Sequence, residues 1–334
     1  MERGRAITPL CEISITPIAA ESLGVRSMCT LVKTPDLSIL LDAGVSLCPY
    51  RFGLPPHPVE FETIAELRRS MAEAADKAQV VTISHYHFDH HTPSFEDWLV
   101  NWTQANETAR QIYQNKIVLL KHPREKINPS QRQRAWMFQK TGGKYAKKLT
   151  IADNKAFDFG NTRIRFSEPV AHGSEHSGLG WVIMAIVEYA EEKFMFAPDV
   201  QGPMSDYTSE LIQAAQPTVI MLGGPPFYLE GTKVDVNQLD LGLKNLENIV
   251  KQVPVVILEH HALRDELWRN KTARVYEAAE KFGHSIMTAA EFRGNENRFL
   301  EYKRAKLFEN FPTSLDFTQW TKTLNSQKVA KPPL

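Results

Sequence analysis

One short segment constrains this chain more than any other: a β-type run that leads directly into a cluster of histidines. Residues 80–83 (VVTI) are followed by residues 84–91 (SHYHFDHH), which hold four of the eleven histidines. Imidazole and carboxylate are ligands that suit zinc, and iron and manganese accept the same ligand types. The alternative interpretation is a solvated loop or a hydrogen-bonded polar cluster. A run of three histidines and one aspartate at this spacing favours a metal centre.

The spacing within the cluster predicts how it binds. In an extended chain, residues i and i+2 point to the same side, so His85 and His87 can both reach one ion. If the chain then bends, Asp89 and His90 face a second ion nearby. We interpret His91 as a neighbour of the metal ligands rather than as a ligand. A ligating histidine usually needs a hydrogen-bond partner on its other ring nitrogen.

The rest of the chain mixes strand and helix patterns. Short runs rich in β-branched residues predict strands, and apolar residues at helical spacing predict helices. We expect strands at 13–18, 25–33, 37–41, 79–84, 163–170, 180–188, 193–197, 218–222 and 253–258. We expect helices at 61–78, 205–215, 236–251 and 271–282, and a charged helical pattern from 288 to about 310.

The domain organisation follows from what the sequence lacks. No Gly/Ser-rich linker and no solenoid-like repeat divides the chain. We predict an N-terminal extension at 1–12, one domain at 13–310 with a basic, mostly helical insert at about 95–150, and a frayed C-terminal tail at 311–334.

The predicted insert is rich in positive charge. Between residues 116 and 148, Glu125 is the only acid among ten lysines and arginines. Such a stripe can attract phosphates, and Trp136, Phe138 and Tyr145 can stack on bases. Residues 141–144 (TGGK) can be flexible enough to close over a ligand. The alternative is an ordinary solvated helical face.

The histidine string resembles the signature of the metallo-β-lactamase superfamily. That resemblance implies an α+β fold, a four-layer αββα sandwich, and it covers nearly the whole chain. Asp42 is similar to the family's early aspartate, which supports the histidine loop. His172 is similar to the third histidine of the first metal, Asp199 to the aspartate that bridges two metals, and His260 to the last ligand.

Two of these matches leave alternatives open. His176 competes with His172 in the same loop, and His261 competes with His260, so that one of the latter pair ligates and the other faces the substrate. Glu259 and Asp42 can supply hydrogen bonds to the ring nitrogens that do not bind metal.

Other segments resemble one branch of the superfamily more narrowly. Residues 21–28 (ESLGVRSM) and 223–226 (GGPP) are similar to a mainly archaeal branch whose members are known only as predicted metal-dependent hydrolases. The loop at 223–226 is either a wall of the substrate pocket or a structural turn. Arg26 and Arg264 either contact an anion or pair with nearby carboxylates.

The resemblance implies a metal-dependent hydrolase. Hydroxide bound between two divalent ions, zinc first and manganese or iron as alternatives, attacks phosphorus or a carbonyl carbon. Asp89 orients the hydroxide, and His260 and His261 act beside it. We expect a small-molecule or nucleic-acid-like substrate, with phosphodiester or phosphate ester bonds ahead of lactones and thioesters.

Two other functions compete with hydrolysis. One is iron-dependent oxygen or sulfur redox chemistry on the same fold. Diiron redox members of the superfamily commonly carry glutamate where this chain has His87, so this position favours hydrolysis. The other is a nucleic-acid-binding module that uses the basic stripe. Such a module has no need for a complete set of metal ligands, so the ligand set argues against it.

Composition sets the remaining limits. Lysine plus arginine equals aspartate plus glutamate, at 39 each, so net charge favours no polyanionic partner. No stretch reaches the roughly 20 apolar residues that span a bilayer, and the first residues lack a secretory apolar core. We therefore expect a cytoplasmic protein without a membrane partner. Cys11, Cys29 and Cys48 form no CxxC motif, which predicts reduced, packed thiols, with one as a metal ligand as the alternative.

Overall fold

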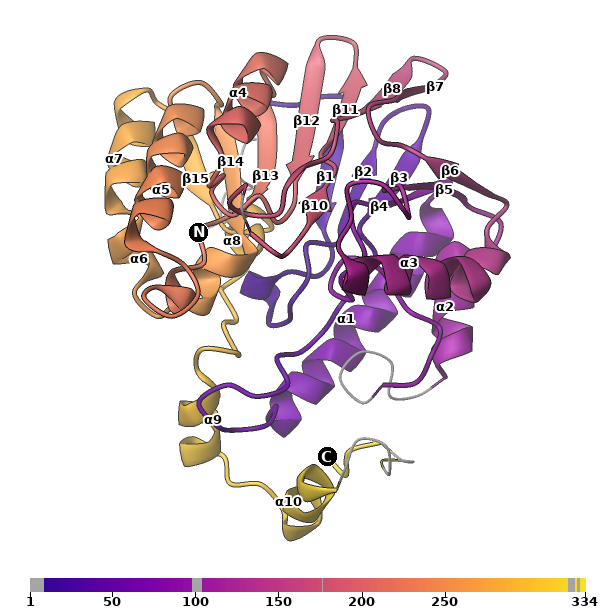
Figure 1. The fold of residues 1–334 in the computed structure, drawn as a ribbon, viewed down its shortest axis with the longest axis vertical. Helices are drawn as coiled ribbons and strands as arrows, with labels where there is room; N and C mark the ends of the chain where they lie inside the picture. Colours follow the sequence, from indigo (N-terminus) through magenta and orange to yellow (C-terminus); the bar gives the residue numbers. More distant parts are fainter. Residues whose placement is uncertain (1–8, 98–103, 176, 324–327, 329–330) are drawn as a thin grey trace.

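Two β-sheets lie face to face at the centre of the protein (Figure 1). The computed structural model describes residues 9–97, 104–175, 177–323, 328 and 331–334. The first sheet has the strand order β1 (Ser14–Pro17), β2 (Thr30–Lys33), β3 (Ser38–Leu41), β4 (Val80–Ile83), β5 (Ile117–Leu120) and β6 (Lys148–Ile151). Strands β3 to β6 run parallel.

The second sheet carries the C-terminal half of the chain. Its order is β15 (Ser285–Met287), β14 (Val255–Glu259), β13 (Val219–Gly223), β12 (Glu192–Ala197), β11 (Ala185–Tyr189), β8 (Thr162–Phe166) and β7 (Ala156–Phe159). Strands β12 to β15 run parallel. A separate pair joins β9 (Val170–Ala171) to β10 (Trp181–Val182).

Alternation of side chains along β12 shows the layer order. Phe194 and Phe196 join the core shared with the first sheet, whereas Met195 and Ala197 join the core under the C-terminal helices. Strands β13 and β14 alternate in the same way, as side chains on a pleated strand must. Both faces of the second sheet are therefore covered, which explains its nearly continuous apolar runs.

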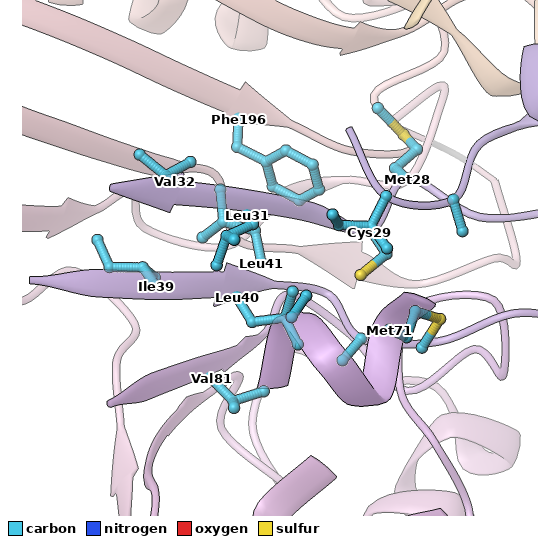
Figure 2. Close-up of a cluster of buried hydrophobic side chains, with 14 of the residues drawn as sticks. Met28, Cys29, Leu31, Val32, Ile39, Leu40, Leu41, Met71, Val81 and Phe196 are labelled. Atoms are coloured by element: carbon cyan, nitrogen blue, oxygen red, sulfur yellow. The ribbon is translucent and has the colours of Figure 1, made fainter. Parts of the chain in front are cut away.

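Helices cover the outer face of each sheet. On the first sheet these are α1 (Pro58–Lys77), α2 (Ala105–Tyr113) and α3 (Pro129–Lys140); on the second they are α4 (Asp206–Ala215), α5 (Val236–Val250), α6 (Trp268–Lys271) and α7 (Ala273–Lys281). Figure 2 shows Phe196 of β12 on one side of β2 and β3, and Met71 of α1 on the other. The four-layer αββα sandwich is confirmed.

The predicted helical insert at 95–150 is wrong in part. This segment holds α2 and α3, but it also supplies β5 and β6 to the first sheet. The apolar run Ile117–Leu120 is short and lies between lysines, so its charge hid a buried strand. Residues 98–103 of the insert lie outside the described residues.

The predicted fraying after residue 311 is also wrong for part of the tail. Helix α10 (Leu315–Lys322) begins at Ser314, whose side chain accepts a hydrogen bond from the Phe317 amide. Phe317 is buried and lies edge-on to Phe61 of α1. We expected a charged helical pattern from 288 to about 310. The structure has two short helices there, α8 (Ala289–Phe292) and α9 (Arg304–Asn310), with irregular chain between them.

At the other end, Leu10 is buried in the core, although we placed it in the N-terminal extension. The division of the chain into extension, domain and tail stays a prediction. Within the described residues, no helix is long and apolar enough to cross a membrane.

Candidate metal centre

Residues from strand ends in both sheets meet at one edge of the sandwich. The histidine string follows β4, His172 follows β9, Asp199 follows β12 and His260 follows β14. The carboxyl ends of parallel strands lie at the same edge of a sheet, where crevices for ligands form. Folding therefore brings together residues that are up to 175 positions apart in the sequence.

The first group of candidate ligands is His85, His87, His172 and Asp199, whose ligand atoms all lie within 4.8 Å of one another. The Asp199 Oδ2 atom lies 2.8 Å from His172 Nε2, 3.1 Å from His85 Nε2 and 3.9 Å from His87 Nδ1. Three imidazoles and one carboxylate oxygen make a donor set that suits zinc.

The second group is Asp89, His90 and His260, and it adjoins the first through Asp199. The Nε2 atom of His260 lies 3.3 Å from Asp89 Oδ2 and 3.3 Å from Asp199 Oδ1, and His90 Nε2 lies 3.3 Å from Asp199 Oδ2. Asp199 Oδ2 thus faces the first group and also His90, whereas Oδ1 faces His260 of the second group. This is the arrangement expected of a carboxylate that bridges two ions.

Burial and charge fit cations at both positions. His90 Nε2 and Asp199 Oδ1 are buried and have no hydrogen-bond partner among the described residues, which is costly unless something binds them. Burial raises the pKa of Asp199, but the surrounding histidines outweigh it and hold that pKa well below its usual range. Burial lowers the pKa of His85 and His87, which keeps them neutral, the form that binds metal.

Asp42 at the end of β3 holds the histidine loop in place. Its carboxylate accepts hydrogen bonds from the Ser84 amide at 2.8 Å, from the Ser84 hydroxyl, and from His90 Nδ1 at 2.8 Å. The last bond leaves His90 Nε2 directed at the second group. Asp42 therefore stands behind the loop, as the family resemblance implies.

The backbone bends sharply at three of these positions. Asp42 (φ 46°), Asp199 (φ 51°) and His260 (φ 66°) are all left-handed, a conformation that costs free energy for residues with a side chain. Each lies where a strand ends, and the bend turns the side chain from the strand direction toward the shared edge.

The two adjacent histidines after β14 have different surroundings. Both histidines form a further group of candidate ligands with Asp199, but the His260 side chain is fully buried and also joins the second group, whereas the His261 side chain is 11% exposed and lines a cavity. His261 Nε2 lies 3.3 Å from Asp199 Oδ1, and its Nδ1 lies 3.2 Å from the Tyr228 hydroxyl. Its assignment as a residue that acts on substrate stays a prediction. His176, the competitor of His172, lies outside the described residues.

The suggested partner role of Glu259 toward a metal-side imidazole is wrong. Its carboxylate points away from the centre and accepts hydrogen bonds from the Ser22 hydroxyl, from the Ala289 amide at 2.9 Å and from the His260 amide at 3.1 Å. Glu259 thus anchors the turn that carries His260. His91 Nδ1 bonds instead to the His87 carbonyl at 2.9 Å, and His91 belongs to no ligand group.

A cavity of about 790 Å³ opens onto the centre. Its walls include His87, Asp89, Asp199, His261 and Tyr228, together with apolar side chains. This volume is within the range of small-molecule sites. Residues 223–226 do not line it, so the loop is a structural turn. A Cβ on Gly223 would lie 2.8 Å from the Asp199 amide nitrogen.

Part of the basic stripe is structural, although most of its lysines and arginines are exposed. Lys121 is buried and pairs with Asp153 at 2.7 Å. Phe138 packs in the core against Tyr113 and His91 rather than on the surface, while Trp136 is exposed. The glycines at 142 and 143 are buried in a 3-10 helix rather than in an open loop.

Sequence reasoning missed the contribution of Gly44. A Cβ at this position would lie 2.3 Å from the His91 amide nitrogen and 2.6 Å from that of His90, so only glycine lets the two loops approach. We expect Gly44→Ala to displace His90 and lower the affinity for the second ion at least tenfold, as changes behind a ligand do. Competition with a chromogenic chelator measures this.

Gly178→Ala is the matched control for that substitution. Gly178 lies on the cavity wall, and a Cβ there meets nothing within 4 Å, so its metal affinity is expected to equal that of the wild type. If Gly44→Ala binds metal as tightly as the wild type, the histidine loop adjusts to the added methyl group without loss of metal affinity.

The layer order and the two ligand groups define the class: a four-layer αββα protein with a candidate two-ion centre. Comparison by sequence then assigns the family. The chain is 41% identical over 293 residues to a UPF0282 protein of Methanopyrus kandleri, covering 88% of this chain and 98% of that one. It is 41% identical over 296 residues to a UPF0282 protein of Methanocaldococcus jannaschii, covering 88% and 96%. This chain belongs to the UPF0282 family. A scan of protein-family models matches none.

Several solved structures match this chain at low scores. The diiron β-hydroxylase CmlA from Streptomyces venezuelae matches with a TM-score of 0.48 and 10% identity, over 84% of this chain and 53% of that one. Tm1679, a metal-dependent hydrolase of the β-lactamase superfamily, matches with a TM-score of 0.44 and 13% identity, over 83% and 96%. Human tRNase Z, short form, matches with a TM-score of 0.41 and 10% identity, over 75% and 92%. The fold assignment therefore rests on the layers and strand order described above.

Proposed function

We propose that this protein is a metal-dependent hydrolase that acts on phosphodiester or phosphate ester bonds. The observation that carries the proposal is the pair of ligand groups that adjoin at Asp199 and lie open to a cavity. Two divalent cations, when bound in such a pair, lower the pKa of water toward neutrality and neutralise negative charge that develops on the substrate.

The protein's own residues then have distinct roles. Asp199 sets the separation of the two groups, and Asp89 lies at the cavity wall with a pKa held well below its usual range, mainly because His260 and His90 outweigh the effect of burial. Asp89 is therefore an ionised acceptor that can orient an attacking water molecule.

His261 and Tyr228 form the opposite side of the reacting position. Burial and the nearby Arg264 keep the pKa of His261 well below its usual value, so this imidazole is neutral. Its two ring nitrogens face Asp199 and the Tyr228 hydroxyl. The pair can position an oxygen of the substrate.

Phosphate ester substrates are favoured over lactones and thioesters by positive charge on the cavity wall. Arg26, Arg134, Lys233 and Arg264 line the cavity, and such groups attract an anionic substrate. Two of them are paired with buried carboxylates: Arg26 with Glu301 and Arg264 with Glu21. Charge focusing in the cavity therefore depends chiefly on the other two.

Metal content measured together with cleavage tests the proposal. Protein purified without a histidine tag is expected to contain about two zinc or manganese ions per chain and to cleave bis(p-nitrophenyl) phosphate until a chelator is added. His87→Ala removes a ligand of the first group and is expected to lose metal and at least about a hundredfold of activity, the upper end of effects at metal-supporting residues. Elemental analysis and a colorimetric rate measure both.

His91→Ala is the neighbouring control. His91 belongs to no ligand group, and its hydrogen bond to His87 reaches only the backbone carbonyl of that residue, so this variant is expected to keep its metals. A His87→Ala protein with two ions per chain would refute the ligand assignment. A single tightly held iron without cleavage would favour the iron-dependent redox alternative instead.

A further inference from the structure

One arginine on the cavity wall differs from its neighbours in having no acidic partner. Arg26 is held by Glu301 through two hydrogen bonds of 2.6 Å, and Arg264 is held by Glu21 at 2.8 Å. Arg134, on α3, forms no ion pair with any carboxylate in the described part of the chain. Its charge is therefore available to a ligand.

Arg134 is also held in a fixed orientation. Its guanidinium carbon lies 4.4 Å from the centre of the Phe88 ring, and Nη1 donates a long hydrogen bond of 3.4 Å to the Tyr86 carbonyl. A guanidinium has five N–H donors, so most remain free. Stacking on an aromatic ring restricts its plane, which reduces the entropy lost when it binds a planar or tetrahedral anion.

Its position relates it directly to the reacting site. Phe88, on which it stacks, precedes Asp89 in the histidine string, and both line the same cavity as Arg134. The side chain is half-buried, so its field is screened less than that of a surface arginine. Asp89 is the acidic group whose charge acts on it, but the two do not pair within 4 Å.

We propose that Arg134 is an anion-binding residue of the substrate site, and that it holds a phosphate group of the substrate other than the one being cleaved. The inference rests on the proposed function for the position of the scissile bond. Arginine matches phosphate through paired N–H donors. The substrate class is thus an organic phosphate with a second phosphate beside its ester bond.

The same helix supplies a matched control. Arg132 lies two residues earlier, so it points to the opposite side of α3. It is exposed, lies away from the metal-site cavity and borders a different hollow with Trp136. Arg132→Gln therefore removes the same charge from the same helix without changing the substrate cavity.

Equilibrium binding tests the proposal without requiring turnover. Calorimetric titration of the zinc-loaded protein with thymidine 3′,5′-bisphosphate and with thymidine 5′-monophosphate compares ligands that differ by one phosphate. In the wild type the bisphosphate is expected to bind about tenfold more tightly, as a charge-assisted contact provides. Arg134→Gln should bring the two Kd values within about twofold, and Arg132→Gln should retain the tenfold ratio.

A second variant keeps the test decisive if Arg134→Gln folds poorly. Arg134→Lys retains the charge but not the paired donors, so an intermediate ratio is expected. Metal content and the thermal unfolding midpoint of each variant establish that it is folded and loaded. Equal Kd values in the wild type, or an unchanged ratio in both Arg134 variants, would overturn the proposal. Cleavage of bis(p-nitrophenyl) phosphate is measured separately, so its absence would reject the proposed function and leave the binding comparison intact.

Discussion

Asp199→Ala is expected to remove both metal ions and to lower activity by at least about a thousandfold, since a two-ion centre supplies both the attacking group and the charge stabilisation. Asp199 contributes an oxygen to each ligand group, with Oδ2 at 2.8 Å from His172 Nε2 and Oδ1 at 3.3 Å from His260 Nε2. Its loss therefore opens both positions at once. Elemental analysis after dialysis and the phosphodiester assay measure the two effects.

Asp89→Ala is the comparison that separates a shared ligand from an unshared one. Asp89 belongs to the second group alone, so this variant is expected to retain one ion while Asp199→Ala retains none. Circular dichroism should show that both proteins are folded. If Asp199→Ala keeps the same metal content as Asp89→Ala, Asp199 does not bridge the two positions.

Arg304→Ala is expected to lower the free energy of unfolding by about 3–5 kcal/mol, the usual cost of breaking a buried ion pair from one side. Arg304 donates two hydrogen bonds of 2.8 Å to Glu60, and both side chains are almost completely buried. The substitution leaves the Glu60 carboxylate without its cation in a low-dielectric core. Urea denaturation monitored by fluorescence measures the change.

The loss in free energy of unfolding caused by Arg304→Ala is also expected to depend on pH. Burial already raises the pKa of Glu60, and removal of Arg304 raises it further. A carboxyl group with a raised folded-state pKa binds a proton more readily when folded, so the deficit of Arg304→Ala should shrink as pH falls. Wild type and variant are compared in the metal-free form, so that release of metal at low pH does not contribute and titration of the histidines affects both proteins alike.

Arg163→Ala serves as the control for charge removal. Arg163 pairs with Asp158 at 3.6 Å on the surface, where both side chains are more than half exposed. Its loss is expected to change the free energy of unfolding by less than about 1 kcal/mol. If Arg163→Ala and Arg304→Ala lower the free energy of unfolding by similar amounts, burial of the Arg304–Glu60 pair does not increase its contribution to stability.

Local sequence was sufficient where a residue's role depends on its immediate neighbours. Strand β4 and the spacing of His85 and His87 follow from an apolar run and from alternation along an extended chain, whereas the sandwich layers were implied by the family resemblance. The distant members of the centre, His172, Asp199 and His260, came from order and resemblance rather than from spacing.

Contacts between segments distant in the sequence decided the strand pairing and the side-chain partners that the sequence did not reveal. Short strands such as Ile117–Leu120 carry too few residues to reveal that they pair inside a sheet, and Glu259 could be placed only when its partners from other elements were known. Gly44 was recognised as a close approach only from the distance to His90. By itself the sequence indicated the metal-ligand chemistry, which depends on residue type and short-range spacing, and its resemblance to the metallo-β-lactamase superfamily implied the αββα architecture. Only the tertiary structure decided which carboxylate meets which imidazole, and which arginine remains unpaired, because those pairings join residues brought together by the packing of the two sheets.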